Sequence, residues 1–299
     1  MWLIPAFISA SLLGLYDVAK KASLRDNAVL PVLLLNTLFS TIIFLPMILA
    51  AESGAGWFDG TILSMPKGDA EAHLLVAVKS RIVLSSWIFG YFGIKHLPIT
   101  IVGPINATRP VMVLLGAMLI FGERLNVMQW IGVLLSIVSL FLLSRSGKRE
   151  GVDFVHNRWI VCVAAAALIG AASGLYDRHI MHFLNPVFVQ AWYNVYQVAM
   201  MAVVVALIWL PKRHLSTPFR WSWAIPLISI LISLADFAYF YALSSDDAMI
   251  SVVSMIRRGS VVVSFACGAL LFREKNLRAK ALDLALILIG MVFLYLGSR

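Results

Sequence analysis

The sequence predicts an all-α integral membrane protein, with ten transmembrane helices arranged as two inverted five-helix repeats. Three observations predict this class. First, 61% of the 299 residues are hydrophobic, 13% are charged and the mean hydropathy is +0.90, whereas soluble domains carry roughly a quarter charged residues. Second, ten apolar stretches are long enough to cross the hydrocarbon core, which takes about 20 helical residues. Third, the tetrapeptide Gly-Leu-Tyr-Asp occurs twice, at residues 14–17 and 174–177.

The ten predicted spans cover residues 2–20, 29–50, 74–94, 99–121, 126–144, 158–180, 187–210, 222–243, 248–272 and 278–297. Residues 282–296 have almost no polar face, which excludes a bundle of soluble amphipathic helices. Prolines 98, 186 and 218 fall in or beside connections, where a missing amide donor costs least. The first span has no basic residue before its apolar run, so we expect a retained helix and not a cleaved signal.

The two halves of the chain match in several places. The repeated tetrapeptide lies in the first span of each half, and residues 119–125 and 270–276 both carry Phe, then Glu two residues later, then a cation. A unit with five spans ends on the opposite side of the membrane, so its second copy is inverted, as in alternating-access carriers. We therefore expect a first repeat over 1–146, a polar linker over 147–157 and a second repeat over 158–299.

Positive charge is distributed unevenly between the two sides. The formal net charge is +9, and 15 of the 24 Lys and Arg residues lie in connections after odd-numbered spans, against 4 on the other side. The positive-inside rule then places both termini outside the cytoplasm. Cations in short connections indicate contact with anionic membrane lipid, so we expect lipid and no nucleic acid as a partner.

Signatures of enzymes are missing from the sequence. We find no HExxH, no phosphate loop, no GxSxG and no CxxC. The two cysteines, Cys162 and Cys267, lie inside apolar spans with no metal-ligand spacing. We therefore expect no catalytic site, no metal and no cofactor.

Charged residues within the spans are the informative candidates, because each one is costly unless it lines a cavity or finds a partner. They are five cations and one carboxylate, which leaves an excess of four positive charges: Lys79, Arg81, Arg109, Arg257, Arg258 and Asp236. Helical rise places Asp236 and Arg257 at depths that differ by about 4 Å, so an ion pair from Asp236 to Arg257 or Arg258 is within reach. The remaining cations need an anionic partner, and a guanidinium can bind a carboxylate or phosphate group of a substrate.

Aromatic and amide side chains complete the predicted site. Tyr193 and Gln197 share one face of the seventh span, which is typical either of a binding surface or of ordinary helix packing. The predicted substrate-binding residues are Arg257, Arg258, Arg109, Asn106, Tyr16, Tyr176, Tyr193, Gln197, Tyr239, Lys79 and Arg81. The predicted coupling or ion-pair carboxylates are Asp236, Asp17 and Asp177. Asp17 either couples protons or pairs with Lys20 or Lys21 one turn further on.

Taken together, these motifs resemble the drug/metabolite transporter superfamily, EamA type. Residues 14–20 are similar to the Gly…Lys pattern in the first span of that family, and Pro110 before Gly122-Glu123 matches its Pro…Gly-Glu spacing. The resemblance implies a ten-helix carrier with a central cavity, peripheral fifth and tenth spans, and termini in the cytoplasm, which is opposite to the charge count.

A narrower similarity concerns the ninth span. Residues 254–263 resemble that span in plastid sugar-phosphate translocators, where an adjacent pair of cations binds phosphate, and Arg257 and Arg258 occupy those positions. Those translocators carry a Lys four residues before the Pro of the fourth span, where this chain has Asn106, with Arg109 directly before Pro110. The similarity therefore implies anion binding without implying phosphate specificity.

The sequence thus predicts a secondary transporter of the bacterial inner membrane that moves a small anionic or zwitterionic metabolite by alternating access. Two alternatives stay open: an exporter of amino acids or amphiphilic compounds with an aromatic cavity, and a non-transporting membrane scaffold or lipid-binding protein. The expected partners are a small-molecule substrate and membrane lipid. Substrate identity, direction, coupling ion, orientation and oligomeric state, monomer included, are left open by the sequence.

Overall fold

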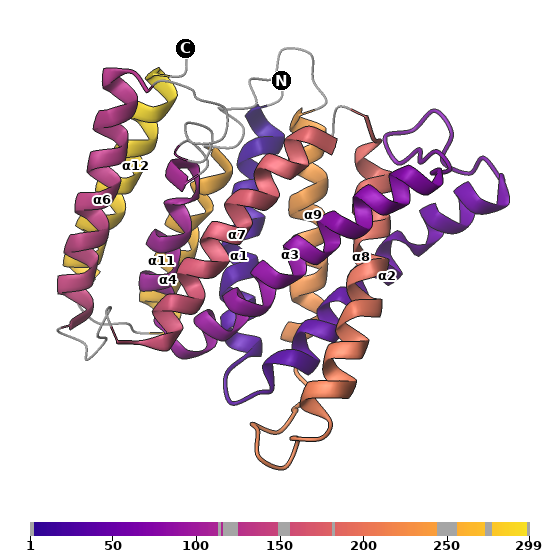
Figure 1. Cartoon of the computed structure of the whole chain (residues 1–299), viewed down its shortest axis with the longest axis horizontal. Helices are drawn as coiled ribbons and strands as arrows, with labels where there is room; N and C mark the ends of the chain where they lie inside the picture. The colour runs from indigo at the N-terminus through magenta and orange to yellow at the C-terminus, as the bar shows by residue number, and fades with distance from the viewer. Residues whose placement is uncertain are drawn as a thin grey trace.

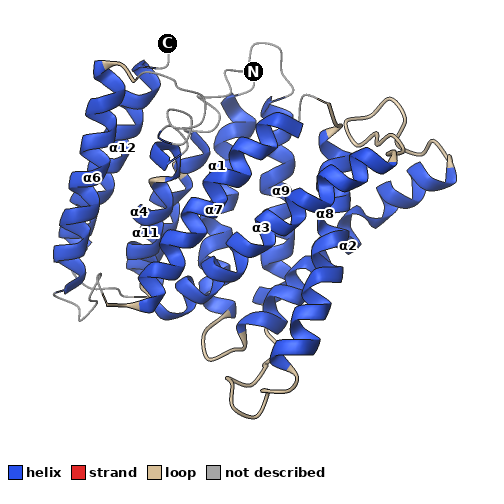
Figure 2. Ribbon diagram, viewed as in Figure 1, coloured by secondary structure: helices blue, strands red, loops and turns tan. Residues whose placement is uncertain are grey.

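The computed structural model describes residues 3–112, 115, 125–148, 156–180, 183–243, 256–272 and 277–297. Within these ranges the regular structure is helical, and most helices run between two opposite edges of the molecule (Figures 1 and 2). The α-helices in the described ranges are α1 (Leu3–Ser23), α2 (Val29–Ser53), α3 (Ala70–His96), α4 (Ile99–Ala107), α6 (Val127–Lys148), α7 (Arg158–Ile180), α8 (Pro186–Val204), α9 (Ala224–Leu243), α11 (Ser260–Leu271) and α12 (Leu277–Gly297). A π-helical segment, η1 (Val205–Trp209), continues α8.

Among the described residues, six helical segments are long and apolar enough to cross a membrane. They are Leu3–Ser23, Val29–Ser53, Ala70–His96, Arg158–Asp177, Pro186–Trp209 and Lys280–Gly297. Two shorter apolar segments, Val127–Leu143 and Ala224–Tyr239, account for the fifth and eighth predicted spans. The all-α membrane fold that the sequence predicts is therefore confirmed.

Local capping chemistry explains where several spans begin and end. α3 begins four residues before the predicted span, because the side chain of Asp69 accepts a hydrogen bond from the amide of Ala72 at 2.8 Å. α8 begins at Pro186, and the side chain of Asn185 accepts bonds from the next two free amides. α2 ends at Ser53, and the left-handed φ of 69° at the following Gly54 lets the chain turn away.

The fourth and ninth spans are interrupted, whereas the sequence predicts continuous helices over 99–121 and 248–272. Thr108 separates α4 from the helical residues 109–112, and Gly259 separates helical residues 256–258 from α11. At both breaks the backbone makes bonds three residues apart, from Thr108 to Ile105 and from Gly259 to Ile256. Residues 116–121 and 248–255 of these spans lie outside the described ranges.

The two breaks occur at equivalent positions of the duplicated sequence. The interval from Thr108 to Gly259 equals the intervals from Phe121 to Phe272 and from Glu123 to Glu274, which end the two spans. Pro110, which lacks an amide donor, accompanies the first break, and Gly259 itself forms the second. The interruption is therefore a feature of both repeats.

Helix packing follows the same duplication. α1 packs on α9 and on α11, and their counterparts α7, α3 and α4 pack together in the same way. The pairs α2–α8, α4–α11 and α6–α12 each join a helix to its own counterpart in the other half. α1 and α7 begin at opposite edges of the molecule (Figure 1), which is the inverted arrangement that five-span repeats predict.

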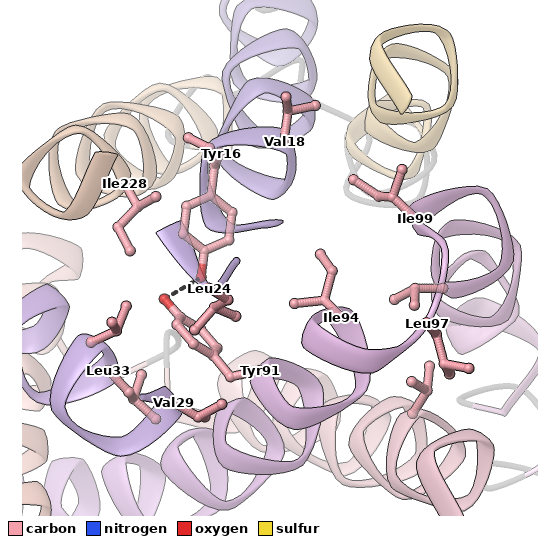
Figure 3. Close-up of a cluster of buried hydrophobic side chains, with 14 of the residues drawn as sticks. Tyr16, Val18, Leu24, Val29, Leu33, Tyr91, Ile94, Leu97, Ile99 and Ile228 are labelled. Carbon is pink, nitrogen blue, oxygen red and sulfur yellow. Dashed lines mark hydrogen bonds between the residues drawn. The ribbon is translucent and has the colours of Figure 1, made fainter. Parts of the chain in front are cut away.

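The α6–α12 pair lies at one side of the molecule, as the resemblance implies for spans five and ten (Figure 1). The two helices approach closely at Gly132 and Gly290, since a Cβ on Gly132 would lie 2.7 Å from the carbonyl oxygen of Gly290. Most of the largest buried core among the described residues lies between the other helices, and α6 contributes Leu143 to it. Figure 3 shows its part near residues 24 and 97, where side chains of α1, α2, α3, α4 and α9 meet.

Candidate functional site

Three arginines beside the two helix breaks form what we call the arginine cluster: Arg109, Arg257 and Arg258. Arg109 directly follows the break at Thr108, and the pair directly precedes the break at Gly259. Thr108 and Gly259 keep right-handed helical dihedrals, so each break is a local distortion of one turn. Discontinuous helices at the interface of inverted repeats commonly border substrate sites in secondary transporters. The inverted repeat thus brings cations from both halves to one region.

Arg257 is the paired member of the arginine cluster. Its guanidinium forms an ion pair with Asp236 of α9 and lies 4.1 Å from the ring centroid of Tyr239. The hydroxyl of Tyr193 donates a hydrogen bond to the second carboxylate oxygen of Asp236 at 3.3 Å. The predicted ion pair of Asp236 is therefore confirmed for Arg257, and it joins the ninth span to α8 and α9.

Arg109 is held by weaker, neutral partners. Its Nη2 donates to Asn106 Oδ1 at 3.2 Å and to the carbonyl oxygen of Ala166 at 3.4 Å. Its Nε is buried and has no hydrogen-bond partner within the described residues. A Cβ on Gly170 of α7 would lie 2.7 Å from Cζ of Arg109, so the glycine leaves room for the guanidinium.

Arg258 has no carboxylate partner within the described part of the chain. The side chain is half-buried and close enough to feel the charges of Arg109 and Arg257, which repel it, and of Asp17, which attracts it. A cation away from bulk water that meets two like charges is unfavourable without a further anion. Arg258 is therefore the cation of this site that most needs an external partner.

Both aspartates of the repeated tetrapeptide form ion pairs with lysines. Asp17 pairs with Lys20 at 2.6 Å, which confirms the predicted pairing one turn along the helix. Asp177 pairs with Lys79 of α3, so this lysine is neutralised by the other half of the protein. Each ammonium also lies near an aromatic ring: Lys20 is 4.4 Å from the ring centroid of Tyr16, and Lys79 is 5.5 Å from that of Tyr193.

These pairs correct the expected charge excess. Arg81 is exposed on α3 and lies apart from the cluster, and two carboxylates join Asp236. Among the described residues, the charged groups of this region are Lys20, Lys79, Arg109, Arg257 and Arg258 against Asp17, Asp177 and Asp236. The excess is two positive charges where the sequence indicates four.

A buried hydrogen-bonded network, here called the tyrosine network, consists of Tyr16, Tyr91, Asn36 and Ser229. The hydroxyl oxygens of Tyr16 and Tyr91 lie 3.3 Å apart (Figure 3), and Asn36 Nδ2 donates to the hydroxyl of Tyr91 at 2.9 Å. Ser229 of α9 donates to Asn36 Oδ1 at 3.0 Å. The network therefore joins α1, α2, α3 and α9 at one end of the arginine cluster.

Next to the tyrosine network, hydrogen bonds link three connections between helices, at residues 24–28, 97–98 and 210–223. Lys21 donates to the carbonyl oxygens of Ile94 and Leu97 at 2.6 and 2.5 Å, which caps the end of α3. Asn27 exchanges two hydrogen bonds with the backbone of Arg220, at 2.7 and 2.8 Å. Lys95 reaches both Asn27 O and Thr217 Oγ1. This face, which carries residues 24–28, 97–98 and 210–223, is closed by contacts between the two halves.

The equivalent tyrosine of the second half behaves differently. Tyr176 is half-buried and donates to the carbonyl oxygen of Leu75 at 3.2 Å, while its counterpart Tyr16 is 4% exposed. Gln197 is fully buried, and its side-chain amide has no hydrogen-bond partner within the described residues. The equivalent tyrosines of the two halves thus differ in burial and in hydrogen-bond partner, although the sequence around them repeats.

Comparison with known proteins shows which protein family the chain belongs to. The sequence model of the EamA-like transporter family matches residues 1–145 and again residues 157–296. The chain belongs to the EamA-like transporter family. The EamA match covers both halves, so the predicted resemblance to the drug/metabolite transporter superfamily is confirmed.

Individual relatives of this EamA protein are distant. A protein of Archaeoglobus fulgidus described as an uncharacterized transporter is 24% identical over 162 residues, which are 54% of this chain and 54% of the relative. The match therefore spans about half of that relative's length. A solved structure described as "Crystal structure of protein" superposes with a TM-score of 0.62 at 19% identity, covering 99% of this chain and 96% of that chain. The latter similarity concerns the fold.

Membership in the EamA-like transporter family places this chain in a family of multi-pass membrane proteins that are named as transporters. Sequence reasoning named the arginine cluster, Asp236, Asp17 and Asp177, but it missed Asn36 and Tyr91 as parts of a polar network. Asn36 carried a signal, because an amide within an apolar span needs a partner. Nothing in the sequence indicates the contact of Tyr91 with Tyr16.

Proposed function

We propose that this EamA transporter carries a small metabolite with one carboxylate or phosphate group, and that Arg258 and Arg109 hold this group. The observation that supports the proposal is the guanidinium of Arg258, which has no carboxylate partner among the described residues and lies beside two other arginines. A carboxylate or phosphate accepts two parallel hydrogen bonds from a guanidinium, and Nε of Arg109, which has no partner among the described residues, offers a further donor.

Alternating access follows from the inverted repeats. The tyrosine network and the lysine contacts close one face, and the second half carries the equivalent Tyr176 in a less buried setting. Rocking of one half against the other would exchange these two arrangements around the arginine cluster. In this proposal Arg257 with Asp236 supports the site, while Arg258 and Arg109 contact the substrate.

Counterflow in proteoliposomes tests the function. Vesicles containing purified protein are loaded with one unlabelled compound, and uptake of trace labelled compound is followed for monocarboxylates, sugar phosphates and amino acids. We expect saturable counterflow with a compound whose net charge is negative. Counterflow confined to amino acids or amphiphilic amines would favour the aromatic exporter, and no counterflow with any of these pools would remove the proposal.

We further propose that the protein lies in a bacterial inner membrane with its closed face toward the cytoplasm, because 15 of the 24 Lys and Arg residues lie on that side. Leu215 is 90% exposed in the connection that follows η1. A Leu215→Cys variant without the two native cysteines is expected to react with a membrane-impermeant maleimide only after the cells are opened. Labelling in intact cells would show the reverse orientation, which the family resemblance implies.

A further inference from the structure

A second group of polar side chains lies where α2, α8 and α9 meet, and we call it the polar seam. Gln190, Asn194 and Gln197 recur along one face of α8, Ser40 comes from α2 and Ser233 from α9. All five side chains are at least nine-tenths buried, Gln197 completely. α2 packs on both α8 and α9, and Gln190 Nε2 donates to the carbonyl oxygen of Ser233 at 3.4 Å, so the three helices share this seam.

Few of these polar groups are satisfied. Asn194 Nδ2 donates to the carbonyl oxygen of Gln190 at 2.9 Å, but Asn194 Oδ1 has no partner within the described residues. The same holds for Ser40 Oγ, Ser233 Oγ and both polar atoms of the Gln197 amide. Buried polar groups are normally hydrogen-bonded, and a cluster of unsatisfied ones costs free energy until a ligand or a rearrangement supplies partners.

The polar seam is continuous with the arginine cluster. Tyr193, directly before Asn194 on α8, donates to Asp236, which lies three residues after Ser233 on α9 and pairs with Arg257. One helical turn, about 5 Å, therefore separates the seam from the charged site. A six-carbon metabolite held by Arg258 at one end is long enough to approach the seam with the other.

The chemistry of the seam selects the kind of group that it can bind. Carbonyl oxygens of the amides accept, the Gln197 amide nitrogen donates, and serine hydroxyls do both, so a group that donates and accepts fits best. An ammonium only donates, and the excess of positive charge among the described residues nearby would repel it. An alkyl chain would leave the same atoms unsatisfied. A hydroxyl both donates and accepts, carries no positive charge and is polar, so it fits the seam.

We propose that the polar seam binds hydroxyl groups of the transported anion, so that the substrate is a hydroxylated acid. This inference rests on the proposed function, because the arginine cluster must hold the acid group. The seam is buried in the conformation described, so hydroxyl binding accompanies separation of α8 from α2 and α9. α2 and α8 belong to different halves, and their separation is part of the rocking motion.

Two monocarboxylates of equal carbon number test the inference: gluconate, which has five hydroxyls, and hexanoate, which has none. Affinity is measured by calorimetry on purified protein in detergent. We expect the wild type to bind gluconate at least about tenfold more tightly than hexanoate, the effect of one or more hydrogen bonds. Gln197→Met, which keeps the length of the side chain, and Ser233→Ala are expected to lose this preference while hexanoate binding stays unchanged.

The control is Gln129→Leu on the peripheral α6, which removes an amide away from the seam and is expected to leave both affinities unchanged. Retained hexanoate binding shows that each seam variant is folded. Equal affinity of the wild type for the two acids, or an undiminished gluconate preference in both seam variants, would overturn the hydroxyl subsite and leave the arginine site standing. If neither acid nor an added phosphate ester bound the wild type, the anion site and the inference would fail together.

Discussion

Replacement of Arg258 by glutamine is expected to abolish binding and transport of the substrate. Arg258 has no carboxylate partner in the described part of the chain, so its charge is available to an incoming anion. Truncation of one partner of a buried, hydrogen-bonded charge pair costs about 2–5 kcal/mol, which corresponds to a loss of affinity of about 30-fold or more. Calorimetric titration with the substrate that counterflow identifies, followed by counterflow with the variant, measures the effect.

Two further variants show whether charge or geometry matters at this position. Arg258→Lys keeps the positive charge but loses the planar pair of donors, so we expect partial binding. Tyr193→Phe removes a hydrogen bond to Asp236 and is expected to weaken binding only slightly. Unchanged affinity in Arg258→Gln, together with a large loss in Tyr193→Phe, would contradict the anion site and favour the aromatic exporter.

Most of the fold follows from the sequence, because membrane thickness constrains it. A span must be apolar over about 20 residues, so composition alone locates α1, α2 and α7 within a few residues. The breaks at Thr108 and Gly259 are not evident, since a single Thr or Gly inside an apolar run is tolerated in many helices. The two positions are recognised as equivalent only when both breaks are located and the sequences of the two halves are aligned.

The candidate site is predictable where its contacts are local. Asp17 with Lys20 follows from helical spacing, and Asp236 with Arg257 follows from the geometry of neighbouring spans. Lys79 with Asp177 joins α3 to α7 across the two repeats, which no local rule indicates. Arg81 is two residues beyond Lys79 and faces away from it, because successive positions on a helix turn about 100°. Sequence alone therefore overstates the charge excess.

We expect removal of the carboxylate partner of Arg257 and removal of the Arg258 charge to have opposite effects on stability. Asp236→Asn leaves the largely buried guanidinium of Arg257 without its carboxylate, and breaking an ion pair of this kind costs up to about 3–5 kcal/mol. The apparent midpoint of thermal unfolding in detergent should fall by on the order of 10 °C. Arg258→Gln removes a charge that Arg109 and Arg257 repel, so without substrate its midpoint should stay the same or rise.

The double variant Asp236→Asn with Arg257→Gln separates loss of the ion pair from loss of packing. It removes both charges, so we expect most of the lost stability to return, because two neutral side chains at this depth need no counter-ion. Recovery in this double variant that exceeds any gain from combining Asp236→Asn with Arg258→Gln assigns the pair to Arg257. If both combinations restored the midpoint to the same extent, Asp236 would neutralise the whole arginine cluster, and Arg258 would no longer require a substrate anion.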